Sequence, residues 1–289
     1  MYLAHWNLRE EPFQNVTDSR FAYLSDQHQE GLARLIYLVK GRKLGGALIG
    51  PYGVGKSMVL EMLAQNVATI PGCRFVRFDV PPGGSSGLAR QVFWSMETGR
   101  TYEDVASVLE TVRGLIANPK SGFQHTVLAI DEAQLIRESD SLDFLHLLTN
   151  FRLTGRPDHP DSPAFTVILA GHEQLAALIA RETALRQRLS MIWHLEPLNE
   201  RQTIEYVESR MRAAGGDIWV FEENALAEVA AASKGIPRMI NNMCDVALMM
   251  GFALKATKIS LSIMQQAVAE VRQPMGIGDD TGAPEGDKV

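Results

Sequence analysis

The chain has 289 residues, of which 46% are apolar and 21% are charged, and its formal net charge is −6. This apolar content excludes a chain that is disordered throughout, and the length allows one large domain or a medium and a small one. The acidic balance does not support a surface that coats nucleic acid, although a local basic patch stays compatible with it. Cys73 and Cys244 lack the spacing of metal ligands, so we expect both to be reduced thiols. No apolar run is long enough to span a bilayer, and we therefore expect a cytoplasmic protein.

In the first two-thirds of the chain, strand and helix patterns alternate. Residues 1–24 carry aromatic side chains and Pro12, which predict an irregular N-terminal arm, and Ser25 is placed to cap a helix to about Val39. Residues 81–87 read as a loop by composition. Alternation predicts an α/β core over 25–197 whose five-stranded parallel sheet is covered by helices on both faces. The expected strands are 44–49, 73–80, 124–130, 164–170 and 191–195, and the expected helices are 57–68, 88–98, 103–117 and 141–152.

From residue 198 onward the pattern predicts helices alone. The segments near 200–214, 222–233, 237–254 and 260–272 have helical periodicity, and glycine or lysine-glycine pairs separate several of them. We therefore expect a small helical domain over 198–273, after a boundary near Pro197. Residues 274–289 are rich in glycine, proline and acidic side chains, which predicts a disordered tail.

The stretch Gly50-Pro-Tyr-Gly-Val-Gly-Lys-Ser57 has the Gly-x-x-x-x-Gly-Lys-Ser spacing of a phosphate-binding loop. Its glycines allow the tight backbone whose N–H groups point at phosphate oxygens. Lys56 would supply positive charge to the β- and γ-phosphates, and the Ser57 hydroxyl would bind Mg²⁺. The expected strand before the loop and helix after it are the context that this motif requires. The expected nucleotide contacts are Gly50, Pro51, Tyr52, Gly53, Val54, Gly55, Lys56, Ser57 and Met58.

A second half of the site is predicted at Asp131 and Glu132, directly after the apolar segment Val127–Ile130. An acidic pair at a strand end, about 75 residues after the loop lysine, is typical of the Walker B motif of ATPases. Asp131 would hold Mg²⁺, and Glu132 would polarise the attacking water. An acidic pair that only caps a strand is the alternative, which the complete loop motif makes less favoured.

Asp131-Glu-Ala-Gln134 resembles the Asp-Glu-Ala-Gln signature of the ExeA (general secretion pathway protein A) family of AAA+ P-loop ATPases. The similarity extends along nearly the whole chain, and a more distant one links it to transposition ATPases of the MuB and TniB type. The other matching positions are Pro12-Phe13, Asp18, Arg20-Phe21, Tyr23, Ser25, His28, Glu30, Leu185–Arg188, Leu195–Leu198, Gly235–Arg238, Ile240-Asn241, Cys244-Asp245 and Leu248.

This resemblance implies an AAA+ core followed by an all-α lid, and it implies roles for two arginines. Arg238, in Gly235-Ile-Pro-Arg238, would be the sensor 2 residue that reaches the nucleotide from the lid, with an ordinary exposed arginine as the alternative. Arg188 would be an arginine finger that enters the site of a neighbouring subunit, and such a finger contributes about 10³–10⁵ in rate. Arg186 competes for that role, and a surface ion pair is a further alternative.

The chain departs from the family at His172. Gly171-His-Glu-Gln-Leu175 stands where the family usually has Gly-Gln-Pro-Glu-Leu. His172 would still donate a hydrogen bond to the γ-phosphate or the water as sensor 1, but its protonation would matter near neutral pH. A histidine whose ring is satisfied by a loop carbonyl is the alternative.

Together these features predict a cytoplasmic AAA+ ATPase that hydrolyses ATP with Mg²⁺ as a homo-oligomer. We expect it to drive conformational change in an unknown protein partner, such as a membrane-associated complex for envelope assembly, secretion or polysaccharide export, as the resemblance implies. A DNA-associated ATPase of the transposition-regulator kind is one alternative, which the acidic balance disfavours. A nucleotide-gated scaffold with little turnover is the other, and His172 is the reason to consider it.

Overall fold

The computed structural model describes residues 2–80, 83–96, 104–118, 121–137, 139–153 and 162–273. These residues form two compact units, and each is described separately. One unit is Thr17–Glu196, and the other combines the residues up to Val16 with those from Pro197 onward. The arm expected over 1–24 is thereby divided between the units, and the tail expected over 274–289 lies outside the described residues.

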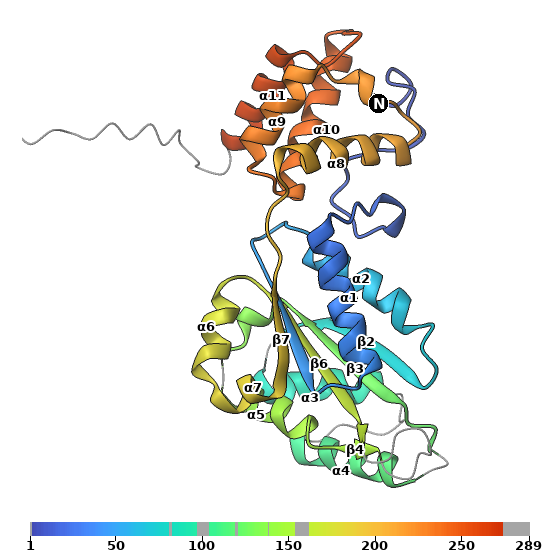
Figure 1. The fold of residues 1–289 in the computed structure, drawn as a ribbon, viewed down its shortest axis with the longest axis vertical. Coiled ribbons are helices and arrows are strands. Elements are labelled where there is room, and N and C mark those ends of the chain that lie inside the picture. The colour runs from blue at the N-terminus through green and yellow to red at the C-terminus, as the bar shows by residue number, and fades with distance from the viewer. Residues whose placement is uncertain are drawn as a thin grey trace, which may run out of the picture. The chain divides into compact units, whose positions relative to one another are not determined.

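The unit Thr17–Glu196 is built on a five-stranded parallel sheet (Figure 1). Its strands, in chain order, are β1 (Gly45–Ile49), β2 (Cys73–Asp79), β3 (His125–Asp131), β6 (Phe165–Gly171) and β7 (Leu189–His194). The spatial order is β2-β3-β6-β1-β7, and all four pairings are parallel. Every residue of β1, β3 and β6 is buried, which explains their continuous apolar runs. The predicted α/β core is confirmed.

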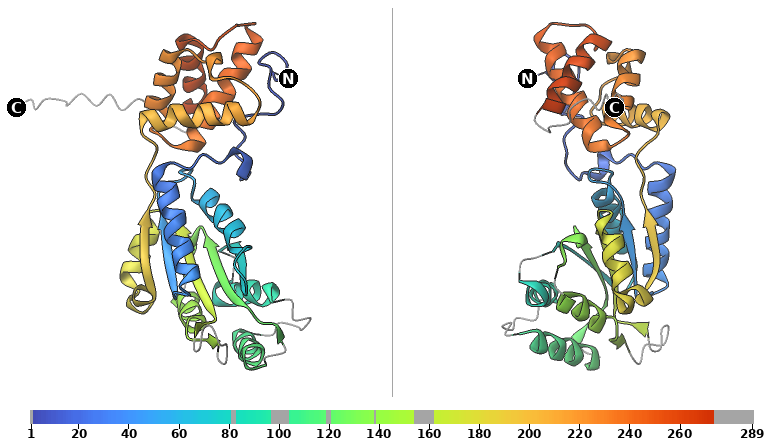
Figure 2. Two further views of the ribbon diagram at one scale, coloured as in Figure 1. Left: turned by 45° about the vertical axis from the view of Figure 1, so that its right-hand side comes forward. Right: turned by 90° about the vertical axis from the view of Figure 1, so that its left-hand side faces the viewer.

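Helices cover both faces of this sheet (Figure 2). On one face, α1 (Asp26–Lys40) and α2 (Lys56–Val67) bury apolar side chains against Val127 and Ile168 of the central strands. Because side chains alternate along a strand, neighbouring residues such as Leu128 enter a second core on the opposite face. The helices of that face are α3 (Gly84–Ser95), α4 (Val105–Ala117), α5 (Ser139–Leu148), α6 (Gln174–Arg181) and α7 (Thr183–Arg188).

Several local features of this unit differ from the prediction. The expected loop over 81–87 is wrong for Gly84–Gly87, which form the first turn of α3 after Gly83 at φ 94°, and its residues 81–82 lie outside the described residues. Glycine and serine tolerate such a helix start, and the packing of α3 in the core outweighs their weak propensity. Neither α6 nor α7 was expected. A small antiparallel pair, β4 (Arg152–Leu153) and β5 (Ser162–Pro163), was not expected either.

The other unit is helical apart from its N-terminal segment and connecting turns, as the periodicity predicts. The N-terminal segment packs on these helices: the Trp6 indole nitrogen donates to the Leu248 carbonyl at 3.0 Å, and Arg210 Nε donates to the Pro12 carbonyl at 2.5 Å. The helices are α8 (Glu200–Ala213), α9 (Glu223–Ser233), α10 (Pro237–Ala253) and α11 (Leu261–Arg272). Short 3-10 turns in the chain are Ser19–Phe21, Ala133–Leu135 and Ile218–Val220. Among the described helices, none combines the length and apolarity needed to cross a bilayer.

Candidate nucleotide-binding site

The glycine-rich loop joins the carboxyl end of β1 to the start of α2. Gly53 and Gly55 have φ angles of 77° and 111°, a region that side chains other than glycine rarely adopt. A Cβ atom on Gly55 would also lie 2.8 Å from the ring nitrogen Nε2 of His28. The loop thus turns sharply enough to direct the amino-terminal end of α2, with its unpaired N–H groups, at the space above the sheet edge.

Lys56 is buried within the loop, with only 6% of its surface exposed. Its ammonium group donates to the carbonyl oxygens of Gly50 at 2.7 Å and Pro51 at 2.9 Å. These two carbonyl groups orient the ammonium without neutralising its charge, and a phosphate is a natural anionic partner for it. The fold therefore places a positive charge where the loop backbone curves.

Ser57 and Asp131 meet at the same edge of the sheet, from α2 and the end of β3. The Ser57 hydroxyl donates to Asp131 Oδ2 at 2.8 Å, and Asp131 is 3% exposed. A hydroxyl and a carboxylate oxygen are hard oxygen donors, which suit Mg²⁺. Among the described residues, no group of three or more His, Cys, Asp and Glu side chains is arranged to hold a metal ion. The Ser57 hydroxyl and the Asp131 carboxylate would suit a magnesium ion that takes its other ligands from phosphate and water.

Arg77 of β2 is a neighbour of this pair that the sequence did not indicate. One of its terminal nitrogens donates to Asp131 Oδ2 at 2.7 Å, and the other donates to the Ser57 carbonyl at 3.2 Å. The guanidinium group therefore balances the buried carboxylate, which would otherwise be costly to desolvate.

Glu132 lies beside Asp131 with a left-handed backbone, at φ 51°. Its carboxylate accepts a hydrogen bond from the Gln134 amide at 2.6 Å, and the Gln134 carbonyl oxygen accepts one from the His172 backbone at 2.9 Å. The His172 ring stacks on Tyr52, with ring centroids 4.5 Å apart. The expected base Glu132 and the expected sensor His172 are thus joined through one glutamine.

His28 of α1 contacts the glycine-rich loop at Val54. Its ring lies 2.6 Å from the Ser25 hydroxyl through Nδ1 and 3.0 Å from the Val54 carbonyl through Nε2. The neutral tautomer with a proton on Nε2 satisfies both contacts, since it donates to the carbonyl and accepts from the hydroxyl. Burial lowers the pKa of His28, and the hydrogen bond to Val54 opposes part of that effect.

The free energy of unfolding should therefore fall in acid because of His28. A histidine whose folded pKa is lowered stabilises the fold above its unfolded value of about 6.5, and that stabilisation is lost as the pH falls below it. Thermal unfolding of the wild type and His28→Gln, at pH 7.5 and at pH 5.5, measures this. We expect the melting temperature to fall less between the two pH values in the variant. An equal fall in both proteins would assign the acid sensitivity to other groups.

Two of the expected arginines, Arg186 and Arg188, lie on α7 of the same unit. Arg188 ends α7, and its guanidinium donates to the Asn150 side chain at 2.9 Å. Arg186 is exposed on the same helix. Arg238 is exposed as the second residue of α10 and belongs to the other unit, so its expected contact with nucleotide stays a prediction.

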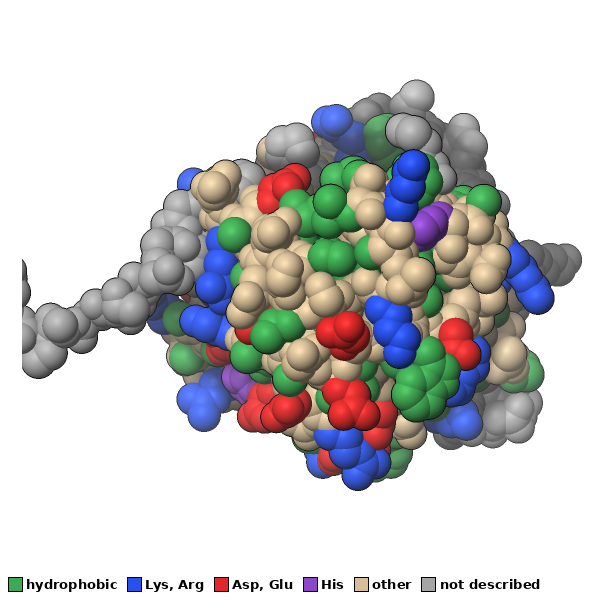
Figure 3. Space-filling view, turned by 90° about the horizontal axis from the view of Figure 1, so that it is seen from above, with side chains coloured by type: hydrophobic (Ala, Val, Ile, Leu, Met, Phe, Trp, Pro, Cys, Tyr) green, Lys and Arg blue, Asp and Glu red, His purple; other side chains and the backbone are tan. Residues whose placement is uncertain are grey.

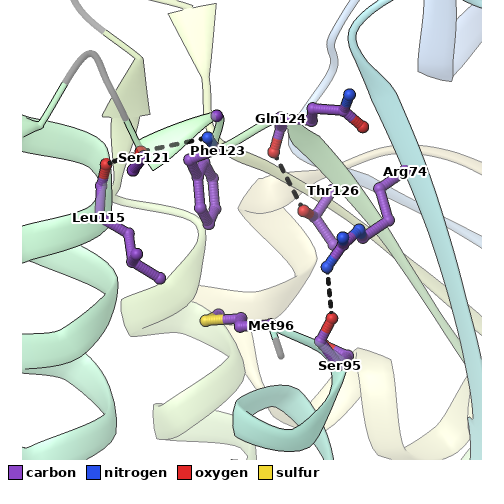
Figure 4. Close-up of a pocket in the computed structure, with 9 residues that line it drawn as sticks. Arg74, Ser95, Met96, Leu115, Ser121, Phe123, Gln124 and Thr126 are labelled. Carbon is purple, nitrogen blue, oxygen red and sulfur yellow. Dashed lines mark hydrogen bonds between the residues drawn. The ribbon is translucent and has the colours of Figure 1, made fainter. Parts of the chain in front are cut away.

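Figure 4 shows a pocket of this unit that lies at the amino ends of β2 and β3, whereas the loop follows the carboxyl end of β1. It is lined in part by Arg74 and Thr126, near the amino ends of β2 and β3, and Arg74 donates to the Ser95 carbonyl at 2.5 Å. Ligands of open α/β sheets bind beyond the carboxyl ends of the strands, so this position does not match a nucleotide site.

Comparisons with known proteins agree with the geometry. A family model described as an AAA domain matches residues 39–179. General secretion pathway protein A of Aeromonas hydrophila is 30% identical over 292 residues, which cover 97% of this chain and 50% of that protein. The chain thus spans about half the length of the curated relative it matches.

Solved structures show the same fold. The Aeropyrum pernix ORC2 protein, in its ADPNP–ADP complexes, superposes with a TM-score of 0.64 at 15% identity, over 87% of this chain and 71% of that one. Drosophila ORC bound to DNA gives a TM-score of 0.63 at 18% identity, over 93% and 67% of the two chains. This chain has the AAA+ P-loop NTPase fold. The predicted resemblance to general secretion pathway protein A is likewise confirmed.

Three side chains of the candidate site were not among the expected site residues. Arg77 and Gln134 reach the acidic pair, and His28 holds the loop. His28 and Gln134 stand within the motifs that carry the resemblance, so the sequence contained a signal for them. Arg77 lies in a strand whose alternating pattern predicts only that its side chain is exposed. The sequence therefore contained no signal for its contact with Asp131.

Proposed function

We propose that this chain binds ATP with Mg²⁺ and hydrolyses it, and that it works as an oligomer on a partner complex. The observation that carries the proposal is the convergence of Lys56, Ser57, Asp131 and Glu132 at one sheet edge, beside a loop whose backbone turns at two glycines. This combination supplies a phosphate-binding cation, two oxygen ligands for a metal and a carboxylate that polarises water.

In this proposal each residue has a separate task. Lys56 and the N–H groups of Gly53–Met58 bind the phosphates, and Ser57 and Asp131 hold Mg²⁺, which neutralises charge on the phosphates when bound. Glu132 accepts a proton from the attacking water. His172 donates to the terminal phosphate or the water, and Arg238 contacts the nucleotide as sensor 2.

Arg77 should compete with magnesium for Asp131, because its guanidinium group already occupies one oxygen of the carboxylate that would hold the ion. Arg77→Met keeps much of the stem's packing and removes the charge. We expect the variant to need about fivefold less Mg²⁺ for half-maximal ATP binding, which corresponds to about 1 kcal/mol for a partly exposed ion pair. Titration of Mg²⁺ with a fluorescent ATP analogue measures this. A higher magnesium requirement in the variant would show that Arg77 instead holds Asp131 in the binding geometry.

Oligomeric action is tested through Arg188, the proposed finger. Arg188→Ala should bind ATP as the wild type does and lose most hydrolysis, by about 10³-fold, since a finger stabilises charge only in the transition state. When mixed with Lys56→Ala, which offers an intact finger, the two inactive proteins should partly restore phosphate release. The matched variant Arg186→Ala should stay active. Absence of recovery in the mixture, or loss of activity in Arg186→Ala instead, would remove Arg188 from this role.

The cellular process in which this chain acts is proposed only from its similarity to general secretion pathway protein A. That relative's name, general secretion pathway protein A, supports the secretion part of the proposed role in secretion or envelope assembly, although the chain spans only half of that protein. Affinity purification with Glu132→Gln in the presence of ATP should retain a partner that ATP-free protein releases. Components of an envelope complex among the retained proteins would support the proposal, and their absence would contradict it.

DNA association is the second candidate function, and the solved ORC structure bound to DNA is the observation that favours it. Against it stand the net charge of −6 and, on the face in Figure 3, basic side chains interspersed with acidic ones among the described residues. Binding of duplex DNA that weakens steeply with salt would favour this function over the secretion role.

A further inference from the structure

Tyr52 and His172 form an aromatic pair above the phosphate-binding loop. Their rings lie nearly parallel, at 16°, with centroids 4.5 Å apart. The Lys56 ammonium is 5.9 Å from the Tyr52 ring centroid. Because this ammonium serves the β- and γ-phosphates in loops of this kind, the Tyr52 ring stands next to the place that a terminal phosphate would take.

Gln134 connects this pair to Glu132. Its amide nitrogen donates to Glu132 Oε2 at 2.6 Å and to the Tyr52 hydroxyl at 3.4 Å, while its carbonyl oxygen accepts from the His172 backbone at 2.9 Å. Gly171 makes room for this arrangement, since a Cβ atom there would lie 2.4 Å from the Gln134 carbonyl oxygen. One side chain therefore contacts the expected base, the loop tyrosine and the sensor segment.

Two features of the Tyr52–His172 pair favour a rearrangement of its side chains. Tyr52 is 52% exposed, so few core contacts hold its side chain. His172 has a buried ring nitrogen, Nδ1, that lacks a hydrogen-bond partner among the described residues. A buried polar atom without a partner destabilises the conformation that contains it, and a rearrangement that exposes the atom or pairs it would be favourable.

We propose that Tyr52, His172 and Gln134 form a set of contacts, here called the clasp, that holds Glu132 in the nucleotide-free protein. The γ-phosphate of ATP opens this clasp. The inference rests on the proposed ATPase function and adds a positioning role for three side chains. In this proposal ATP displaces the Tyr52 ring when its terminal phosphate binds beside Lys56, whereas ADP lacks that phosphate and leaves the clasp closed. Displacing Tyr52 breaks its contact with Gln134 and frees Glu132 to face the water. The clasp therefore opposes the binding of ATP and has little effect on ADP.

The test is the ratio of two affinities, measured by calorimetry with Mg²⁺ for ADP and for the β,γ-imido analogue of ATP. Tyr52→Leu removes the stacked ring, and the ratio should shift about threefold to tenfold toward the analogue, as expected for the loss of one aromatic pair. Gln134→Met should shift it in the same direction. Because both changes open one clasp, Tyr52→Leu should add less in the Gln134→Met background than it does alone. Tyr37→Leu, at an exposed tyrosine of α1, is the matched control and should keep the wild-type ratio.

A ratio that stays within twofold of the wild type in Tyr52→Leu, or that shifts toward ADP, would overturn the clasp. Full additivity of the two changes would overturn the role of Gln134 as the link. A wild-type chain that binds neither nucleotide would overturn the proposed function together with the clasp. A wild type that binds both, with variants that keep its ratio, would overturn the clasp alone.

Discussion

Lys56→Ala should weaken ATP binding at least about a hundredfold, because the substitution removes charge-assisted hydrogen bonds worth about 1.5–3 kcal/mol each. Lys56 is held inside the loop by the Gly50 and Pro51 carbonyls. It is the one charged residue in the sequence Gly50–Ser57, so no other side chain of the loop can replace its charge. Displacement of a fluorescent ATP analogue measures the loss.

Lys43→Ala provides the control for this variant. Lys43 is exposed and precedes β1, so its removal changes the net charge equally without touching the loop. The control should bind ATP as the wild type does. If Lys56→Ala bound ATP with wild-type affinity, the phosphate-binding role of the loop would be untenable.

Glu132→Gln should keep ATP binding and lower hydrolysis by about 10²–10⁴-fold, the range that general-base catalysis contributes. The amide has the shape of the carboxylate and can still accept the hydrogen bond from Gln134, so the local structure is preserved. It has lost only the basicity. Single-turnover measurement of ATP cleavage, after binding has been verified, isolates this effect.

Glu173→Gln is the matched change at the same edge of the sheet. Glu173 is 53% exposed in its side chain and lies 3.9 Å from His194, outside the contacts of the acidic pair. This variant should cleave ATP at the wild-type rate. Wild-type turnover in Glu132→Gln would mean that another group serves as the base.

The fold was predictable because its signals are local. The loop motif, the buried strand before it and the apolar run that ends at Asp131 each occupy consecutive residues, and their order fixes a parallel sheet with the loop at its carboxyl edge. The same patterns, which the sequence alone contains, predict that Lys56, Ser57, Asp131 and Glu132 meet at one place. Their chemical roles stay predictions until they are measured.

The contacts around that cluster were not predictable from consecutive residues. Arg77 reaches Asp131 only because β2 and β3 pair in parallel with Arg77 opposite Ala129. The stacking of Tyr52 on His172 joins two loops that are far apart in the chain and meet beside β1 and β6. Such neighbours follow from register and side-chain packing, which hydrophobic periodicity does not encode.

The central claim is that this chain turns over ATP, and magnesium-dependent phosphate release by the purified wild type at neutral pH tests it most directly. Lys56→Ala, assayed in parallel, sets the background. We expect steady release above that background, abolished by chelation of Mg²⁺. Tight binding of ATP with release no greater than in Lys56→Ala, at protein concentrations that support assembly, would contradict the claim and leave a nucleotide-gated scaffold in its place.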